Sequence, residues 1–316
     1  MPAQAAAPSS AATSAPTKVV VTYANLIADH LPLWIAVDGG IFAKNGLDVT
    51  LQMVQSSAEV PALIAGQTQF DEGGASQALS AAVAGGDIEF IGTITPVYPF
   101  VFEVPASIQT PNDLKGNKVG VSGIGTSSDI AARVALTKMG LDPEKDVTIV
   151  TVGSAQDRRA ALISGAIQGG VAQPPDSLRL EAEGFHPIYN LATSGALTGT
   201  NVLTVARTYA SSHRDVVQKF IDSMVEAIAR EKQDEAFSIQ VLQKYLQYDN
   251  QDDLMKTWSF YVTQVHPSVP LLNIAQFDDA KQVLAASNPN VANFDVSGLL
   301  DNSFVQSAAD RGLAAP

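Results

Sequence analysis

The sequence predicts an α/β fold of two similar lobes, joined by two hinge crossings, with a ligand cleft between the lobes. Three observations point to this fold class. Short β-branched segments alternate with helical patterns, this alternation occurs twice, and extended segments lie between the two occurrences. Such alternation is typical of parallel strands connected by crossover helices.

Each half of the chain contains one set of these elements, and most of the helical patterns stop near a glycine, a common residue at helix C-termini. In the first half we expect a strand at 18–23, a helix at 31–44, a strand at 48–54, helices at 58–65 and 75–84, and a strand at 88–94. In the second half we expect a strand at 118–122, a helix at 127–139, a strand at 147–152 and a helix at 155–164.

The two halves are also similar residue by residue. The segment ALIAG at 62–66 matches ALISG at 161–165, an offset of 99 (161 − 62), and the same offset pairs Gln69 with Gln168. Similarity at a fixed offset predicts two lobes of one topology. Each lobe is expected to present strand ends and helix N-termini to the cleft.

Extended segments at 96–105 and 191–205 are interpreted as the two crossings. The first lobe is therefore expected to contain residues 18–97 and 203–316, and the second lobe residues 98–202. Further helical patterns follow and are expected to pack back onto the first lobe, at 213–232, 235–246, 252–265 and 274–286.

Residues 1–17 are expected to form a disordered tail that remains after a leader has been removed. Ala, Ser, Thr and Pro dominate this segment, which lacks the charged and apolar regions of an intact signal peptide. We therefore expect an exported protein, although a plain flexible extension has the same composition. No apolar segment reaches the roughly 18–20 residues that a spanning helix needs.

Charge and residue types exclude several functions. The 316 residues carry a formal net charge of −13, which disfavours nucleic acid or an anionic membrane surface as a partner. There is no cysteine, and the four histidines have no metal-ligand spacing. Neither H-E-x-x-H nor G-x-S-x-G occurs. We therefore predict a binding protein rather than an enzyme, with no cofactor and no metal.

Five motifs follow one another in a characteristic order: LPLWIA at 31–36, GIF at 40–42, GLDV at 46–49, DLKG at 113–116 and GLDP at 140–143. In this order the chain resembles the nitrate/sulfonate/taurine and thiamine-pyrimidine (NMT1-like) family of periplasmic solute-binding proteins, over about residues 19–205. The resemblance implies a type II periplasmic binding fold and a monomer that closes on a small molecule. It also implies a cognate ABC permease and ATPase as partners, and a location on the periplasmic or extracellular face of the cell envelope. The membrane would be reached only through the permease or an N-terminal anchor.

The candidate ligand-binding residues lie mainly at strand-to-helix turns, where glycines, hydroxyls and free helix N–H groups suit small anions. The strongest turn is 123–129, with 55–58 as its first-lobe counterpart. One of Arg158 and Arg159, early in the helix expected at 155–164, can pair with an anion. Helix capping is the alternative for the turns, and core packing is the alternative for Trp34. The full set is Tyr23, Asp29, His30, Trp34, Ser56, Ser57, Gly74, Ala75, Ser76, Thr126, Ser127, Ser128, Asp129, Gln156, Arg158, Gln173 and Pro174.

Glycine-lined helix termini favour a small organic anion of the sulfonate or aromatic carboxylate class. A thiamine-pyrimidine or another heteroaromatic ligand is the alternative, if Asp29, Asp129 or Tyr98 faces the cleft. A thiamine-pyrimidine synthase with the same fold is disfavoured, because those enzymes carry a cysteine-rich motif.

Overall fold

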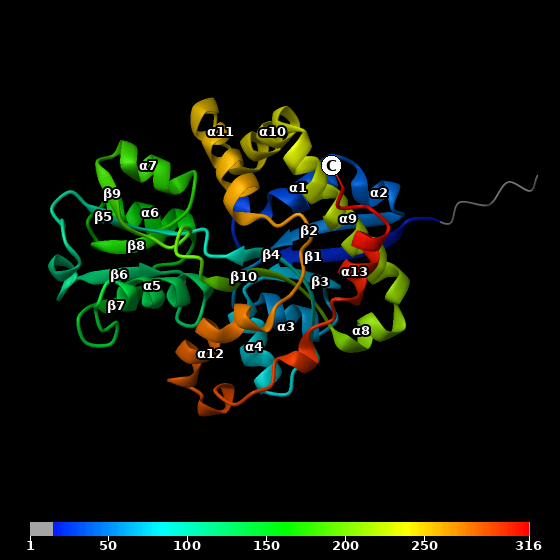
Figure 1. The fold of residues 1–316 in the computed structure, drawn as a ribbon, viewed down its shortest axis with the longest axis horizontal. Helices are drawn as coiled ribbons and strands as arrows, with labels where there is room; N and C mark the ends of the chain where they lie inside the picture. Colours follow the sequence, from blue (N-terminus) through cyan, green and yellow to red (C-terminus); the bar gives the residue numbers. More distant parts are fainter. Residues whose placement is uncertain (1–14, 316) are drawn as a thin grey trace, which may run out of the picture.

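The computed structural model describes residues 15–315, which form two lobes side by side, each built on its own five-stranded sheet (Figure 1). The predicted fold class is confirmed, because helices cover a mixed sheet in both lobes. Residues 1–14 of the predicted tail lie outside the described residues. The first strand begins at Thr17, which the prediction placed in the tail. Within 15–315, no helix combines the length and the apolar character needed to cross a membrane.

In the first lobe the sheet is mixed. Its strands lie in the order β2 (Leu47–Met53), β1 (Thr17–Tyr23), β3 (Phe70–Gly73), β10 (Leu197–Val205) and β4 (Glu89–Val97). β1 pairs in parallel with β2 and β3, whereas β10 is antiparallel to both β3 and β4. The carboxyl ends of β1 and β3 therefore meet at the same edge, which faces the second lobe.

Two apolar clusters hold helices on the two faces of this sheet. One cluster includes α1 (Leu31–Asp38), α2 (Ile41–Lys44), α9 (Arg214–Gln233), α10 (Glu235–Leu246) and α13 (Ser303–Asp310), and the other includes α3 (Glu59–Ile64), α4 (Ala75–Val83) and α12 (Asp278–Ala285). The single helix predicted at 31–44 is two helices, because Gly40 has φ of +67°, a left-handed conformation that ends an α-helix.

The second lobe repeats this plan. Its strands lie in the order β7 (Thr148–Thr151), β6 (Lys118–Val121), β8 (Gly169–Ala172), β5 (Val101–Pro105) and β9 (Phe185–Asn190). β6 is parallel to β7 and β8, and β5 is antiparallel to β8 and β9. The helices are η2 (Pro111–Leu114), α5 (Ser127–Lys138), α6 (Ala155–Ile163) and α7 (Asp176–Ala182).

The residue-level repeat corresponds to a repeated structural unit. In each lobe the first strand of the unit is flanked by the second and third strands, as β2-β1-β3 and β7-β6-β8. The paired glutamines bind the backbone of that central strand in both lobes. Val20 N–H donates to Gln69 Oε1 at 2.8 Å, and Lys118 N–H donates to Gln168 Oε1 at 3.3 Å.

The chain crosses between the lobes twice. It leaves the first lobe between β4 and β5, at residues 98–100, and returns between β9 and β10, at residues 191–196. The predicted boundary at 202/203 falls inside β10, which pairs with β4 from Leu197 onward. Gly199 lets β10 approach α4 closely, since an added Cβ would lie 2.7 Å from the Cβ of Ala75.

The C-terminal helices pack on the first lobe. Besides α9, α10, α12 and α13, they are α8 (Arg207–Ser212), α11 (Gln251–Phe260) and the short turns η3 (Tyr261–Val265), η4 (Ile274–Phe277), η5 (Pro289–Val291) and η6 (Ser297–Leu299). α9 packs on the sheet by stacking Phe220 on Phe70, with ring centroids 3.9 Å apart. α12 contacts both α4 and α5, so this helix joins the two lobes at one side (Figure 1).

Candidate functional site

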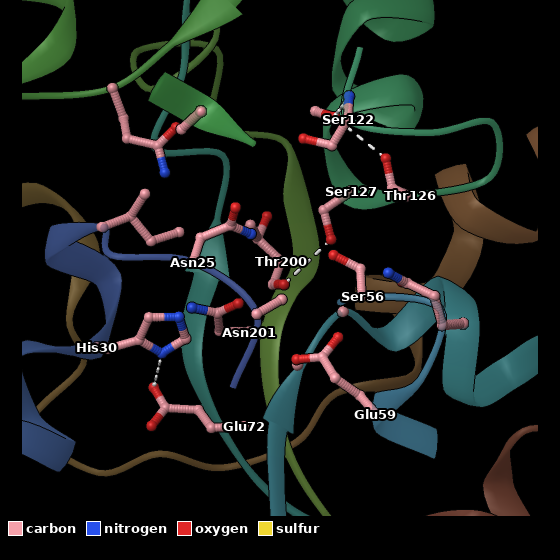
Figure 2. A pocket seen from close by; sticks show the side chains of 18 of the residues that line it. Asn25, His30, Ser56, Glu59, Glu72, Ser122, Thr126, Ser127, Thr200 and Asn201 are labelled. Carbon is pink, nitrogen blue, oxygen red and sulfur yellow. Dashed lines mark hydrogen bonds and ion pairs between the residues drawn. The ribbon is translucent and has the colours of Figure 1, made fainter. Parts of the chain in front are cut away.

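A pocket lies between the two lobes, and residues of both lobes line it. The first lobe contributes the residues that follow β1, the end of β3, the start of α3 and part of β10. The second lobe contributes the turn before α5, the start of α6 and the residue after β8. Figure 2 shows these two sides facing each other, with Ser122, Thr126 and Ser127 across from Glu59 and Glu72.

The N-terminus of α5 forms part of the second-lobe side. Thr126 is the N-cap residue, but its side chain makes no capping bond and donates instead to the Gly123 carbonyl at 2.7 Å. Ser128 Oγ accepts from Ser122 N–H at 2.8 Å. These bonds shape the turn, and the first N–H groups of a helix have no intrahelical acceptor. The positive end of the α5 dipole is therefore directed at the pocket.

Arg158 lies beside this helix terminus and is the cationic residue of the pocket. Its guanidinium is held in place, because Nε donates to the Val171 carbonyl at 2.7 Å and Nη1 donates to Ser122 Oγ at 2.9 Å. The side chain is 4% exposed, and burial lowers the pKa of Arg158 to about 10, so it stays charged at neutral pH.

Within residues 15–315, no carboxylate lies within 4 Å of the Arg158 guanidinium. The nearby Asp176 pairs with other arginines, at 3.1 Å from Arg159 and 3.0 Å from Arg179. Asp157 directly precedes Arg158 and Arg159 in the sequence. Its carboxylate accepts from the N–H of Ser154 instead and forms the capping box of α6. Arg158 is thus a buried charge facing a pocket with hydrogen bonds but no counter-ion.

Carboxylates dominate the first-lobe side. Glu59 and Glu72 line the pocket, and Asp71 lies directly behind them. Glu72 Oε1 lies 3.2 Å from His30 Nδ1, and Thr22 Oγ1 donates to Asp71 Oδ1 at 2.8 Å. All three carboxyl groups are almost completely buried, with exposed fractions of 2% or less.

This burial changes the protonation of the three groups. Burial raises the pKa of Glu59 well above its ordinary value, and the charges of Asp71 and Glu72 raise it further. Burial also raises the pKa of Asp71 to about 7, although the hydrogen bond from Thr22 opposes this. For Glu72, burial raises the pKa and the adjacent His30 lowers it in part. The first-lobe side is therefore a group of acids that compete for protons.

Direct contacts hold the lobes together around the pocket. Ser127 Oγ donates to the Thr200 carbonyl at 3.2 Å, and Gln173 Nε2 donates to Asp29 Oδ1 at 3.1 Å. At the rim, the Arg179 guanidinium lies 3.6 Å above the centre of the Tyr248 ring. The structure therefore has its lobes in contact, with the pocket between them.

Eight of the predicted ligand-binding residues line this pocket: His30, Ser56, Gly74, Thr126, Ser127, Ser128, Arg158 and Gln173. Gln156 and Pro174 line a neighbouring hollow at the rim, together with Gln173 and Arg179. Ser57 lines a different surface hollow beside Ile124.

The other six predicted residues do not line the pocket. Trp34 is fully buried in the first-lobe core and stacks on Tyr245, with ring centroids 4.6 Å apart. Asp29 accepts hydrogen bonds from Tyr261 and Gln173, and Asp129 pairs with Arg133 at 2.8 Å. Tyr23, Ala75 and Ser76 are buried next to the pocket.

Sequence reasoning missed the acidic side of the pocket and the contribution of β10. The missed polar residues are Asn25, Glu59, Glu72, Gln77, Ser122, Thr200 and Asn201. One signal was present: Asp71 and Glu72 are two adjacent acids directly before Gly73 and Gly74, where β3 ends. Charged residues at such a strand end point to a site rather than to a core. Nothing local marks Thr200 and Asn201, because only the pairing of β10 with β3 and β4 brings them here.

Within residues 15–315, no group of three His, Asp or Glu side chains is placed to hold a metal ion.

The two-lobed architecture with an interlobe pocket is a fold of the periplasmic-binding type. A family model described as "NMT1/THI5 like" matches residues 27–236, about two thirds of the chain. This chain belongs to the NMT1/THI5-like family. Comparison with curated proteins gives no match.

Solved structures share this fold. A protein from Bordetella bronchiseptica RB50 has a TM-score of 0.79 at 21% identity, over 94% of this chain and 98% of that one. The periplasmic aliphatic sulphonate binding protein SsuA from Escherichia coli has a TM-score of 0.70 at 22% identity, over 88% and 90%. The alkanesulfonate-binding protein SsuA from Xanthomonas axonopodis pv. citri, bound to MOPS, has a TM-score of 0.70 at 19% identity, over 93% and 98%.

One structural neighbour corrects the prediction that this chain is not an enzyme. The desulfurization enzyme DSZB has the same fold, with a TM-score of 0.69 at 16% identity, over 94% of this chain and 99% of that one. Binding proteins and an enzyme therefore share this architecture. The lack of cysteine and of histidine motifs does not distinguish a binding protein from an enzyme with this fold. The prediction that excluded an enzyme on that basis is therefore wrong.

Proposed function

We propose that this protein is the solute-binding component of an ABC importer and that its lobes close on a small organic anion of the sulfonate or aromatic carboxylate class. On this proposal the protein is exported to the periplasmic or extracellular face of the envelope, where a cognate permease recognises the closed form. The similarity to periplasmic sulfonate-binding proteins supports this role.

The observation that carries the anion assignment is the unpaired charge of Arg158. A buried guanidinium without a counter-ion costs several kcal/mol, and an anionic ligand group removes that cost. The α5 N-terminus and the hydroxyl of Ser122 lie next to it and supply further donors. A sulfonate or carboxylate has the oxygens that such donors need.

The test is a comparison of Arg158→Gln with Arg159→Gln, its neighbour on the same helix. A thermal-shift screen of propanesulfonate, benzenesulfonate and benzoate at millimolar concentration identifies a binding anion. A ligand at about 1,000 times its Kd adds about 4.1 kcal/mol, which moves the melting temperature by several degrees.

For the anion so identified, calorimetry is expected to give at least about tenfold weaker binding to Arg158→Gln, because charge-assisted hydrogen bonds contribute about 1.5–3 kcal/mol. Arg159→Gln is expected to bind as the wild type does, since Arg159 is paired with Asp176. Equal affinity in Arg158→Gln and the wild type, with both empty proteins folded, would refute the anion site.

A further inference from the structure

The first-lobe side of the pocket contains a carboxylate that the anion proposal leaves unexplained. Glu59 is 2% exposed, lines the pocket, and its Oε1 has no hydrogen-bond partner among the described residues. Figure 2 shows this carboxylate directed toward the interior of the pocket, on the same side as Glu72.

The surroundings of Glu59 add negative charge rather than neutralising it. Asp71 Oδ2 and Glu59 Oε1 converge at Gly73, where an added Cβ would lie 2.7 Å from the first atom and 3.2 Å from the second. Throughout residues 15–315, no Lys or Arg nitrogen lies within 4 Å of a carboxylate oxygen of Glu59, Asp71 or Glu72, and the basic side chain at this side is His30, with Nδ1 3.2 Å from Glu72 Oε1.

A group of buried acids is costly for the empty protein. Each carboxylate either stays charged without a partner or takes up a proton, and both cost free energy of folding at neutral pH. An apolar side chain in place of Glu59 would avoid this cost. A positively charged ligand group at the same position removes it too, because it pairs with the carboxylate in a low-dielectric site.

We propose that the solute is a zwitterion, in which a protonated amine or a similar N–H cation binds Glu59 while the anionic group binds Arg158. The inference rests on the proposed function, because it takes the interlobe pocket as the solute site. The two charges lie on different lobes, so the solute spans the pocket. Of the carboxylates named from the sequence as partners for a nitrogen base, Asp129 pairs with Arg133 and Asp29 accepts from Tyr261 and Gln173 through Oδ1, and neither residue lines the pocket.

The test uses matched pairs of compounds that differ only in an amino group: 3-aminopropanesulfonate with propanesulfonate, 4-aminobutyrate with butyrate, and 4-aminobenzenesulfonate with benzenesulfonate. Calorimetry at neutral pH measures each compound on the wild type, on Glu59→Gln, and on Glu235→Gln, which changes an exposed residue of α10. Circular dichroism confirms that each variant is folded, and Glu72→Gln serves as a second variant of the acidic side.

We expect the amino compound of at least one pair to bind the wild type and Glu235→Gln at least tenfold more tightly than its partner. Glu59→Gln is expected to lose this preference and to keep its affinity for the compound without the amine. Equal or tighter binding of the amine-free compounds to the wild type, or an unchanged preference in folded Glu59→Gln, overturns this inference and leaves the anion proposal standing. If no compound of any pair binds, the anion proposal itself fails, and this inference fails with it.

Discussion

The stability of the empty protein is expected to depend on pH through Asp71. Burial raises the pKa of this carboxyl from 3.8 to about 7, so the folded state holds the proton more tightly than the unfolded state does. Its stabilising contribution is therefore fully present below about pH 4 and is lost as the pH rises through 7. The difference between the two pKa values corresponds to on the order of 4 kcal/mol.

Asp71→Asn removes this titration with little other change. The amide oxygen can still accept from Thr22 Oγ1, which lies 2.8 Å from the carboxylate. The substitution also removes a charge that raises the pKa of Glu59, so it weakens the pH dependence that Glu59 contributes, and the two effects act in the same direction. Asp48→Asn, at an exposed position in β2, is the matched control.

Urea unfolding between pH 4 and pH 8 measures the effect, with tryptophan fluorescence as the probe because Trp34 is buried in the first lobe. The free energy of unfolding of the wild type and of Asp48→Asn is expected to fall relative to Asp71→Asn as the pH rises. Parallel curves for the wild type and Asp71→Asn over this range would refute the reasoning, because they would show that Asp71 takes up no proton on folding.

Two further predictions concern closure and the core. The identified ligand is expected to reduce the radius of gyration in small-angle scattering. Tyr248→Leu removes the contact with Arg179 across the rim and is expected to raise the Kd of that ligand about two- to fivefold. An unchanged radius at saturation would contradict closure. Trp34→Ala is expected to lower the free energy of unfolding by about 3–5 kcal/mol in urea titrations, because a fully buried indole leaves a cavity. A loss below about 1 kcal/mol would place Trp34 outside the core.

The sequence was sufficient for the fold because the relevant signals are local and repeated. Alternating strands and helices, stops at glycine and the offset between Gln69 and Gln168 each reflect contacts within one α/β unit. The same local signals identified the turn at 123–129. They also identified Arg158, near the start of the helix expected at 155–164. These residues reach the pocket because strand ends and helix starts of one lobe lie on one side of its sheet.

The remainder of the site depends on contacts that no local pattern encodes. Trp34 and Asp29 follow the first strand, where residues that line the cleft are expected. Helices far along the chain cover them instead: Tyr245 of α10 stacks on Trp34, and Tyr261 of η3 donates to Asp29. Conversely, Asn201 reaches the pocket only because β10 inserts between β3 and β4. Tertiary packing therefore decides which polar residues at the cleft stay free for a ligand.

The charges that packing leaves free also explain why solute binding and closure are coupled on the proposed function. Arg158 on one lobe and Glu59 on the other line the same pocket, yet no ion pair joins them. Closing over an empty pocket removes both groups from water without giving either a partner, a cost of several kcal/mol per charge that protonation of Glu59 reduces only in part. In an open arrangement water solvates both. A simple anion removes the cost at Arg158 alone, whereas a zwitterion removes both costs, and only when the two lobes are close enough for it to reach both.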